Sequence, residues 1–245
     1  MLKRADLFFI IIIVLLFLPF LVNENILNTY KAFNHDHGLI TSFIKFSILA
    51  TLGEFLGHRI RTAYYLQKGF GIIPRMIVWG VIGVTIKIAF IIFAVGTPVF
   101  LEYVGIKGAS TVLQTNLGAE KVFVAFCTSV ALNVIYAPVM MIFHKIMDMH
   151  IISNGGTIKG LFSPVKFKEI FVNLNWSVQW NFVFKKTIPF FWIPAHTITF
   201  LLNPDYQVLF AAFLGIMLGA ILAVADMMDK QSVIKRPKRE TLKPN

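Results

Sequence analysis

The chain has few of the charged residues that keep a protein soluble in water. Only 14% of its 245 residues are charged, against about 25% in an ordinary soluble protein. Its single cysteine, Cys127, lies inside an apolar stretch, so an intramolecular disulfide is excluded. The sequence also lacks an HExxH helix, a GxSxG elbow and a glycine-rich phosphate loop. The common signatures of metalloproteases, serine hydrolases and nucleotide-binding enzymes are therefore absent.

What the chain has instead is apolar sequence. Apolar residues make up 57% of it, including 25 phenylalanines. A helix needs about 20 mostly apolar residues to cross a bilayer. Six stretches approach that length: 7–22, 39–57, 76–101, 121–143, 188–202 and 206–225. The sequence therefore predicts an integral membrane protein of the all-α class, a polytopic transmembrane helix bundle of about six spans.

Positive charges fall mostly on one side of these spans. The formal net charge is +11, from 23 basic and 12 acidic residues, which in a soluble protein would suggest a nucleic-acid partner. Here most of the Lys and Arg residues lie in alternate loops, as the positive-inside rule describes for cytoplasmic segments. We expect six crossings, both termini in the cytoplasm and no nucleic-acid partner.

The N-terminal apolar stretch, 7–22, has two interpretations. Lys3 and Arg4 before it suit a secretory signal peptide, but no small-x-small cleavage site follows, so an uncleaved anchor is preferred. We expect one transmembrane helical domain over 1–228, with 7–22 as an additional span, and a basic cytoplasmic tail over 229–245. No Arg- and Ser-rich presequence is visible, which favours a bacterial plasma membrane over an organelle.

A stretch rich in lysine and aromatic residues precedes the fifth span. Its apolar residues recur at helical spacing, with two tryptophans nearby: Phe167, Ile170, Phe171, Leu174 and Val178, with Trp176 and Trp180. Such a pattern is typical of an amphipathic helix in the lipid headgroup region. A cytoplasmic extension of the fifth span explains it equally well.

The last span carries a stripe of small residues spaced by four: Ala211, Gly215, Gly219 and Ala223. Residues at this spacing share one helix face, and small residues let another helix approach closely. The stripe predicts helix packing within the bundle, with a contact between two copies of the chain as the alternative.

Charged and strongly polar residues inside apolar spans are the main functional signal. Glu54, Lys87, Asn133 and His196 each lie in a candidate span. A charge there costs roughly 2.5 to 3.5 kcal/mol and normally faces the bundle interior or a wet cavity. Because side chains lean toward the N-terminus of their helix, we expect Glu54 and Lys87 to lean toward each other. They would form an ion pair that fixes helix register, or line a polar path.

The other two residues of this predicted polar interior lie near prolines. Asn133 precedes Pro138 by five residues, so its amide is expected to bond a backbone group freed by the proline or to line a pore. His196 follows Pro194 in a span also interrupted by Pro189, where irregular backbone is expected. It would bond a neighbouring helix, or act as a gate titrating at about pH 6.5.

Two groups of histidine and aspartate residues offer metal-ligand chemistry. The group at 35–37 lies on the outer side of the predicted topology and cannot join the group on the inner side. That inner group comprises His144, Asp148 and His150, which His58 would complete. Solvated polar residues at helix ends are the simpler interpretation. We expect no cofactor, and keep a metal-dependent membrane enzyme as an alternative.

Spacings in the fourth and fifth spans resemble those of a known family. Asn133 stands five residues before Pro138, which follows an alanine, and Trp192 stands eight before Phe200, which precedes Pro204 by four. These spacings resemble the Mpv17/PMP22 family of small integral membrane proteins, in which a Gln before an Ala-Pro pair and a Trp, Phe and Pro recur.

The resemblance extends over about 42–225 and leaves the first span as an addition. The Gln-Val-Leu-Phe-Ala-Ala run at 207–212 is similar to the Arg-Val-Leu-Phe-Ala segment that opens the family's last helix, and Leu-Gly-Glu at 52–54 to its early Gly-Asp. The chain departs from the family pattern at Thr199, Gln207 and Met217. It therefore looks like a distant member.

The resemblance implies a compact helical bundle of the mitochondrial inner or peroxisomal membrane type with channel-like permeation. We accordingly expect a channel or facilitator that passes small polar solutes or ions through a polar bundle interior. Membrane lipid and solute are the expected partners, with a homo-oligomer as an option. The alternatives are the metal-dependent enzyme and a non-transporting scaffold or adaptor that uses the small-residue stripe.

Overall fold

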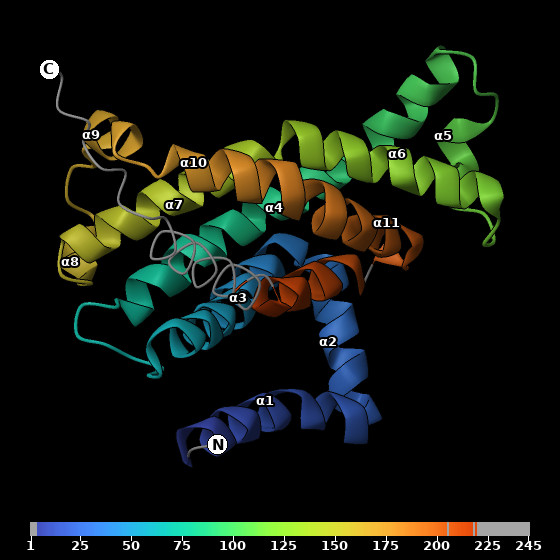
Figure 1. The fold of residues 1–245 in the computed structure, drawn as a ribbon. Coiled ribbons are helices and arrows are strands. Elements are labelled where there is room, and N and C mark those ends of the chain that lie inside the picture. The colour runs from blue at the N-terminus through green and yellow to red at the C-terminus, as the bar shows by residue number, and fades with distance from the viewer. Residues whose placement is uncertain (1–3, 205, 218, 220–245) are drawn as a thin grey trace, which may run out of the picture.

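Long helices run side by side in this chain, and one helical arm stands apart from them (Figure 1). The computed structural model describes residues 4–204, 206–217 and 219. The labelled helices are α1 Arg4–Val22, α2 Glu24–Asp36, α3 Gly38–Thr62, α4 Ile72–Tyr103, α5 Ala109–Val112, α6 Ala119–Ile135, α7 Ala137–Ser153, α8 Ile158–Leu161, α9 Phe167–Val172, α10 Trp176–Val178, the π-helix η1 Gln179–Trp192 and α11 Ile193–Leu201. An unlabelled helix follows at Tyr206–Met217. Across the described residues there is no strand, so the all-α prediction is confirmed.

Three of these helices, α1, α3 and α4, are long and apolar enough to cross a membrane. The pair α6 and α7 passes the same test together, with a bend of 42° at the break between them, so the count becomes four if that pair is one span. The predicted fifth span, 188–202, is divided between η1 and α11, and the predicted sixth extends beyond the described residues. The described helices thus supply three or four of the six predicted crossings.

Small residues bring α3 and α4 together at the centre of the bundle. A Cβ atom on Gly80 would lie 2.5 Å from Ser47 Oγ, and one on Gly83 would lie 2.6 Å from Phe46 Cβ. Ser47 Oγ donates a hydrogen bond of 2.8 Å to the carbonyl of Met76. This close antiparallel contact fixes the register of the two helices, and so decides which α4 residues face the C-terminal half of α3.

The predicted small-residue stripe lies against α3. A Cβ atom on Gly53 would lie 2.5 Å from the carbonyl oxygen of Gly215, and one on Gly57 would lie 2.6 Å from that of Gly219. The stripe therefore makes contact within the chain, glycine against glycine. Of its other members, Ala211 is buried and Ala223 lies outside the described residues.

The turn after α7 braces the connection between α3 and α4. The helix ends at Ser153, and Gly155 and Gly156 follow with φ of 69° and 68°, a conformation that favours glycine. A side chain on Gly156 would collide with the backbone of Gly69. The glycine signal at 154–156 therefore ends a helix and also seats the 63–71 connection on that turn.

The segment before the fifth span is not the single amphipathic helix that its spacing suggested. The helix α9 ends at Val172, and residues 173–175 separate it from α10. The side chain of Asn175 caps the next helix by accepting a hydrogen bond of 3.1 Å from Val178 N. From there α10, η1 and α11 run on without a break, so the alternative interpretation, an extension of the fifth span, describes this part better. The π-helical backbone of η1, which contains Pro189, fits the irregularity expected here.

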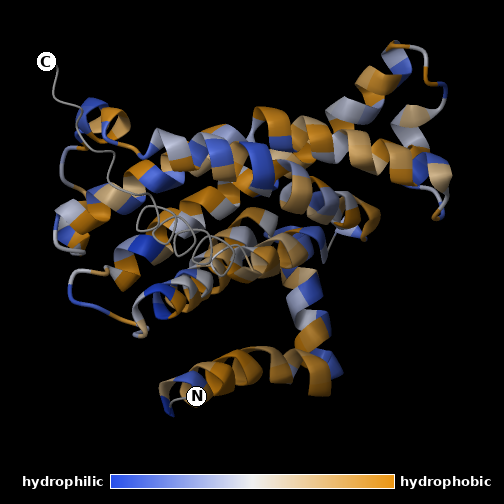
Figure 2. Ribbon diagram, in the orientation of Figure 1, coloured by the Kyte–Doolittle hydropathy of each residue, from blue (hydrophilic) through white to orange (hydrophobic). Residues whose placement is uncertain are grey.

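The arm α1 is fixed to the bundle at its N-terminal end. Asp6 accepts two hydrogen bonds from Arg59, of 2.7 and 2.8 Å, and one of 3.0 Å from the Tyr65 hydroxyl. Phe9, the one buried residue of α1, stacks on Tyr65 with ring centroids 4.9 Å apart. Burial raises the pKa of Tyr65, and its hydrogen bond to Asp6 raises it further, so the hydroxyl stays a donor. The rest of α1 is mostly apolar (Figure 2). Much of it is exposed, as suits a helix facing lipid, while partly buried side chains within 13–17 pack against the core.

Alanine at Gly53 tests the glycine contact. We expect Gly53→Ala to destabilise the bundle by roughly 1–3 kcal/mol, because its methyl group meets backbone that cannot move aside cheaply. Gly96→Ala is the matched control, since Gly96 lies within α4 with no atom within 4 Å of its added Cβ. Alanine there raises helix propensity and should stabilise slightly. Thermal unfolding of both variants in detergent measures the difference, and equal midpoints would contradict the close contact.

Candidate functional site

A buried ion-pair network joins α3, α4 and α7. Arg75 of α4 forms ion pairs with Glu54 of α3 and with Asp148 of α7. Its Nε donates a hydrogen bond of 2.7 Å to the carbonyl of Phe70, whose ring centroid lies 4.4 Å from the guanidinium carbon. Arg75 is only 6% exposed. An arginine this deep needs partners for its charge and its donors, and this site supplies both.

Each carboxylate of the network has further partners. Glu54 Oε1 accepts a hydrogen bond of 2.6 Å from Trp79 Nε1 and lies 2.8 Å from His144 Nε2. The Trp79 and His144 rings pack together with centroids 4.2 Å apart. On the other side, Lys145 Nζ donates a hydrogen bond of 3.1 Å to Asp148 Oδ2. The two acidic groups are thus held by partners from two helices, α4 and α7.

Helical spacing explains how the chain presents these side chains. Arg75 and Trp79 are four residues apart on α4, and His144 and Asp148 are four apart on α7, so each pair shares one helix face. Both faces turn toward Glu54. The sequence analysis placed Arg75 in a loop before the span at 76–101, whereas α4 already begins at Ile72, so it did not connect Arg75 with Trp79. Their spacing at the start of an apolar run was the available signal.

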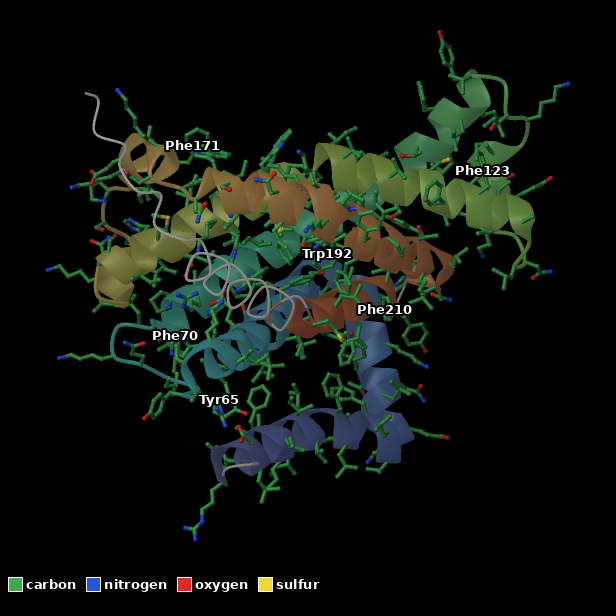
Figure 3. The ribbon with its side chains drawn as sticks, viewed as in Figure 1. Tyr65, Phe70, Phe123, Phe171, Trp192 and Phe210 are labelled. Carbon is green, nitrogen blue, oxygen red and sulfur yellow. The ribbon has the colours of Figure 1, made fainter. Side chains whose placement is uncertain are left out.

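A pocket of about 480 Å³ opens beside this network. It is bounded by α3, α4, α7, α10, the start of η1, the connection at 67–70 and two glycines of the small-residue stripe, Gly215 and Gly219. Its charged and imidazole-bearing lining residues are Glu54, His58, Arg61, Lys68, Arg75, His144, Lys145 and Asp148. Phe70, also in the lining, lies at the same end of the bundle as Tyr65 (Figure 3). The pocket therefore sits at the end where α3 and α7 finish and α4 starts.

The structure separates Glu54 from Lys87, so the expectation that they lean toward each other is wrong. Lys87 is half-buried beside Gly38, whose added Cβ would lie 3.4 Å from Lys87 Cε. Gly38 begins α3 and Glu54 lies sixteen residues later, about 24 Å along the helix at 1.5 Å per residue. The register of α3 against α4 places Arg75, and not Lys87, opposite Glu54.

Asn133 and His196, predicted separately, lie together. Asn133 Nδ2 is 3.0 Å from His196 Nδ1 and also donates a hydrogen bond of 2.9 Å to the carbonyl of Ser129. The histidine ring packs against Trp192, with centroids 4.9 Å apart, and edge-on against Phe90. The amide therefore serves a helix-to-helix contact between α6 and α11, and its backbone bond goes to Ser129 and not to a carbonyl freed by Pro138. Neither residue lines the pocket.

The four residues considered for a metal site do not converge. His144 and Asp148 belong to the network, and His58 faces the same pocket. His150 is buried elsewhere, with Nε2 3.2 Å from the carbonyl of Leu161. Over the part of the chain that the structure describes, no three His, Cys, Asp or Glu side chains form a group able to hold a metal ion.

Removal of the central arginine tests the network. We expect Arg75→Met to destabilise the bundle by roughly 3–5 kcal/mol, because it leaves two buried carboxylates without their shared cation. The triple variant Arg75→Met, Glu54→Gln, Asp148→Asn removes all three charges and should recover much of the loss. Thermal unfolding in detergent measures both. A triple variant no more stable than Arg75→Met would mean that charge pairing is not what holds these helices.

A double-mutant cycle tests the Asn133–His196 contact. Asn133→Leu leaves a buried imidazole nitrogen without a partner, which costs about 1–3 kcal/mol. In the background of His196→Phe the same substitution should cost clearly less. Additive losses in thermal stability would show that the two side chains do not interact.

The chain matches no family model, no curated protein and no solved structure. The resemblance to the Mpv17/PMP22 family thus rests on the residues and spacings quoted above. The candidate functional site consists of the pocket and the ion-pair network that borders it.

Proposed function

We propose that this protein is a membrane facilitator for small polar solutes, a distant member of the Mpv17/PMP22 family, with the pocket beside Glu54, Arg75 and Asp148 as its solute entry site. The observation that carries the proposal is a cavity of about 480 Å³ lined by charged side chains, set among helices long enough to cross a membrane. Cavities of about 300–1,000 Å³ are typical of small-molecule sites.

The proposed topology has six crossings with both termini in the cytoplasm of a bacterial cell. In support, the N-terminus of α1, the ends of α3 and α7 and the start of α4 lie at one end of the bundle (Figure 1). Of the basic connections, the one between α3 and α4 and the one around α8 lie at that end (Figure 1), as the positive-inside rule describes. The segment formed by η1 and α11, and the helix that begins at Tyr206, would add the fifth and sixth crossings. The pocket would then open to the cytoplasm.

The polar interior proposed for transport differs from the one expected from sequence. Glu54 stays in it, joined by Arg75, and the Asn133–His196 contact would be a second polar point deeper in the bundle. Lys87 lies away from the pocket and is left out of the proposed polar interior.

The alternative of a metal-dependent enzyme loses support because His150 lies beside the carbonyl of Leu161, away from the other candidate ligands. An adaptor acting through the small-residue stripe loses support because Gly215 and Gly219 pack inside the chain.

Blocking the pocket tests the proposal. Purified protein carrying Cys127→Ser and Gln67→Cys is reconstituted in liposomes, and influx of small labelled solutes is measured. Gln67 is exposed and lines the pocket, so a bulky thiol reagent attached there should abolish most of the influx. Cys127→Ser with Asn116→Cys, labelled in an exposed connection that does not line the pocket, should keep it.

Two results would contradict the proposal. Well-folded protein that passes no solute is not a facilitator. Influx that is equally insensitive to labelling at both cysteines would place the route for solute outside this pocket.

A further inference from the structure

The pocket carries more positive than negative charge. Among the described residues, four cations and two carboxylates line it. The cations are Arg61, Lys68, Arg75 and Lys145, and the carboxylates are Glu54 and Asp148. Because a cleft lined by one excess sign of charge concentrates solutes of the opposite sign, this imbalance favours an anion.

Both carboxylates are already engaged with protein groups. Glu54 contacts Arg75, Trp79 and His144, and Asp148 contacts Arg75 and Lys145. Their charge is largely compensated inside the wall of the pocket, so they offer little to an incoming cation. Lys68, which also lines the pocket, is exposed. The charge that a solute meets on entry is therefore positive.

His58 supplies an independent observation. It is only 9% exposed, it lines the pocket, and its ring lies 5.2 Å from that of Phe70. Its Nε2 atom is buried and has no hydrogen-bond partner among the described residues. Buried polar atoms nearly always have a partner in folded proteins, so an orphaned one at a cavity wall points to an absent ligand or water. With its proton on Nε2, the imidazole would donate a hydrogen bond to an anionic oxygen that reached this buried atom.

We propose that the pocket binds small soluble anions bearing a carboxylate or phosphate group, with His58 as a direct donor and Lys68 as part of the positive entrance. That the facilitator selects anionic solutes for transport rests on the proposed function. That the pocket binds anions does not depend on it. Charge-assisted bonds from an imidazole and from lysine are the ordinary means of holding such groups.

Direct binding tests the proposal without requiring transport. The full chain is placed in nanodiscs of neutral lipid at low salt, and calorimetry measures binding of inorganic phosphate, succinate, choline and glycerol. We expect both anions to bind and the cation and neutral solute not to bind. His58→Phe keeps the ring packing but removes the donor, and should weaken anion binding roughly tenfold. Lys68→Gln should weaken it by a smaller factor, and Lys107→Gln, in a connection that does not line the pocket, should leave it unchanged.

The outcomes separate this proposal from the proposed function. Anion binding that weakens in both pocket variants supports the site, even if liposomes show no influx of any solute. Choline binding as tight as phosphate binding overturns the anion site. If His58→Phe fails to fold, Lys68→Gln decides alone, and a Lys68→Gln protein that binds anions like the wild type also overturns the site. Influx of solutes without anion binding would support the proposed facilitator function and overturn the proposed anion site. If succinate binds in nanodiscs of neutral lipid but not in nanodiscs of anionic lipid, lipid headgroups occupy the pocket. That result would overturn the proposal that its ligand is a soluble anion.

Discussion

The buried guanidinium of Arg75 is the constraint on which the arrangement of α3, α4 and α7 depends. A charge that is 6% exposed cannot stay without partners, and its partners come from the two neighbouring helices, Glu54 from α3 and Asp148 from α7. The same contacts hold Trp79 and His144 against each other. The mutual register of the three helices therefore has to satisfy this group of charges.

Small residues make that register reachable. Gly80 and Gly83 let α4 approach α3 on one side, while Gly53 and Gly57 let the helix that begins at Tyr206 approach it on another. Larger side chains at these points would move the backbones apart and lengthen the contacts of the network that cross from α3 to α4. Apolar close packing and buried ion pairing thus act together, because the geometry that the charges need is set by glycines that carry no charge.

The polar residues of the spans serve different purposes in the folded chain. Glu54 belongs to the wall of a charged pocket at one end of the bundle. Asn133 and His196 form a buried contact between α6 and α11 among aromatic rings. A polar residue in an apolar span therefore indicates that a partner exists, but it does not indicate whether that partner is another helix or a solute. In the pocket wall, the Nε2 atom of His58 is buried without a hydrogen-bond partner among the described residues.

The sequence by itself determined the helical class, the apolar stretches, the small-residue stripe and the identity of several polar residues, because these follow from composition and from spacing along one helix. It also predicted irregular backbone near Pro189, which η1 confirms. Only the tertiary structure decided the partners. Glu54 was expected beside Lys87, yet the close contact of α3 with α4 sets Arg75 opposite it, and Asn133 turned out to face His196, sixty-three residues away in the sequence. Helical periodicity tells which residues share a face, whereas the depth and rotation at which two helices meet depend on the packing of their side chains, and that is not readable from either helix alone.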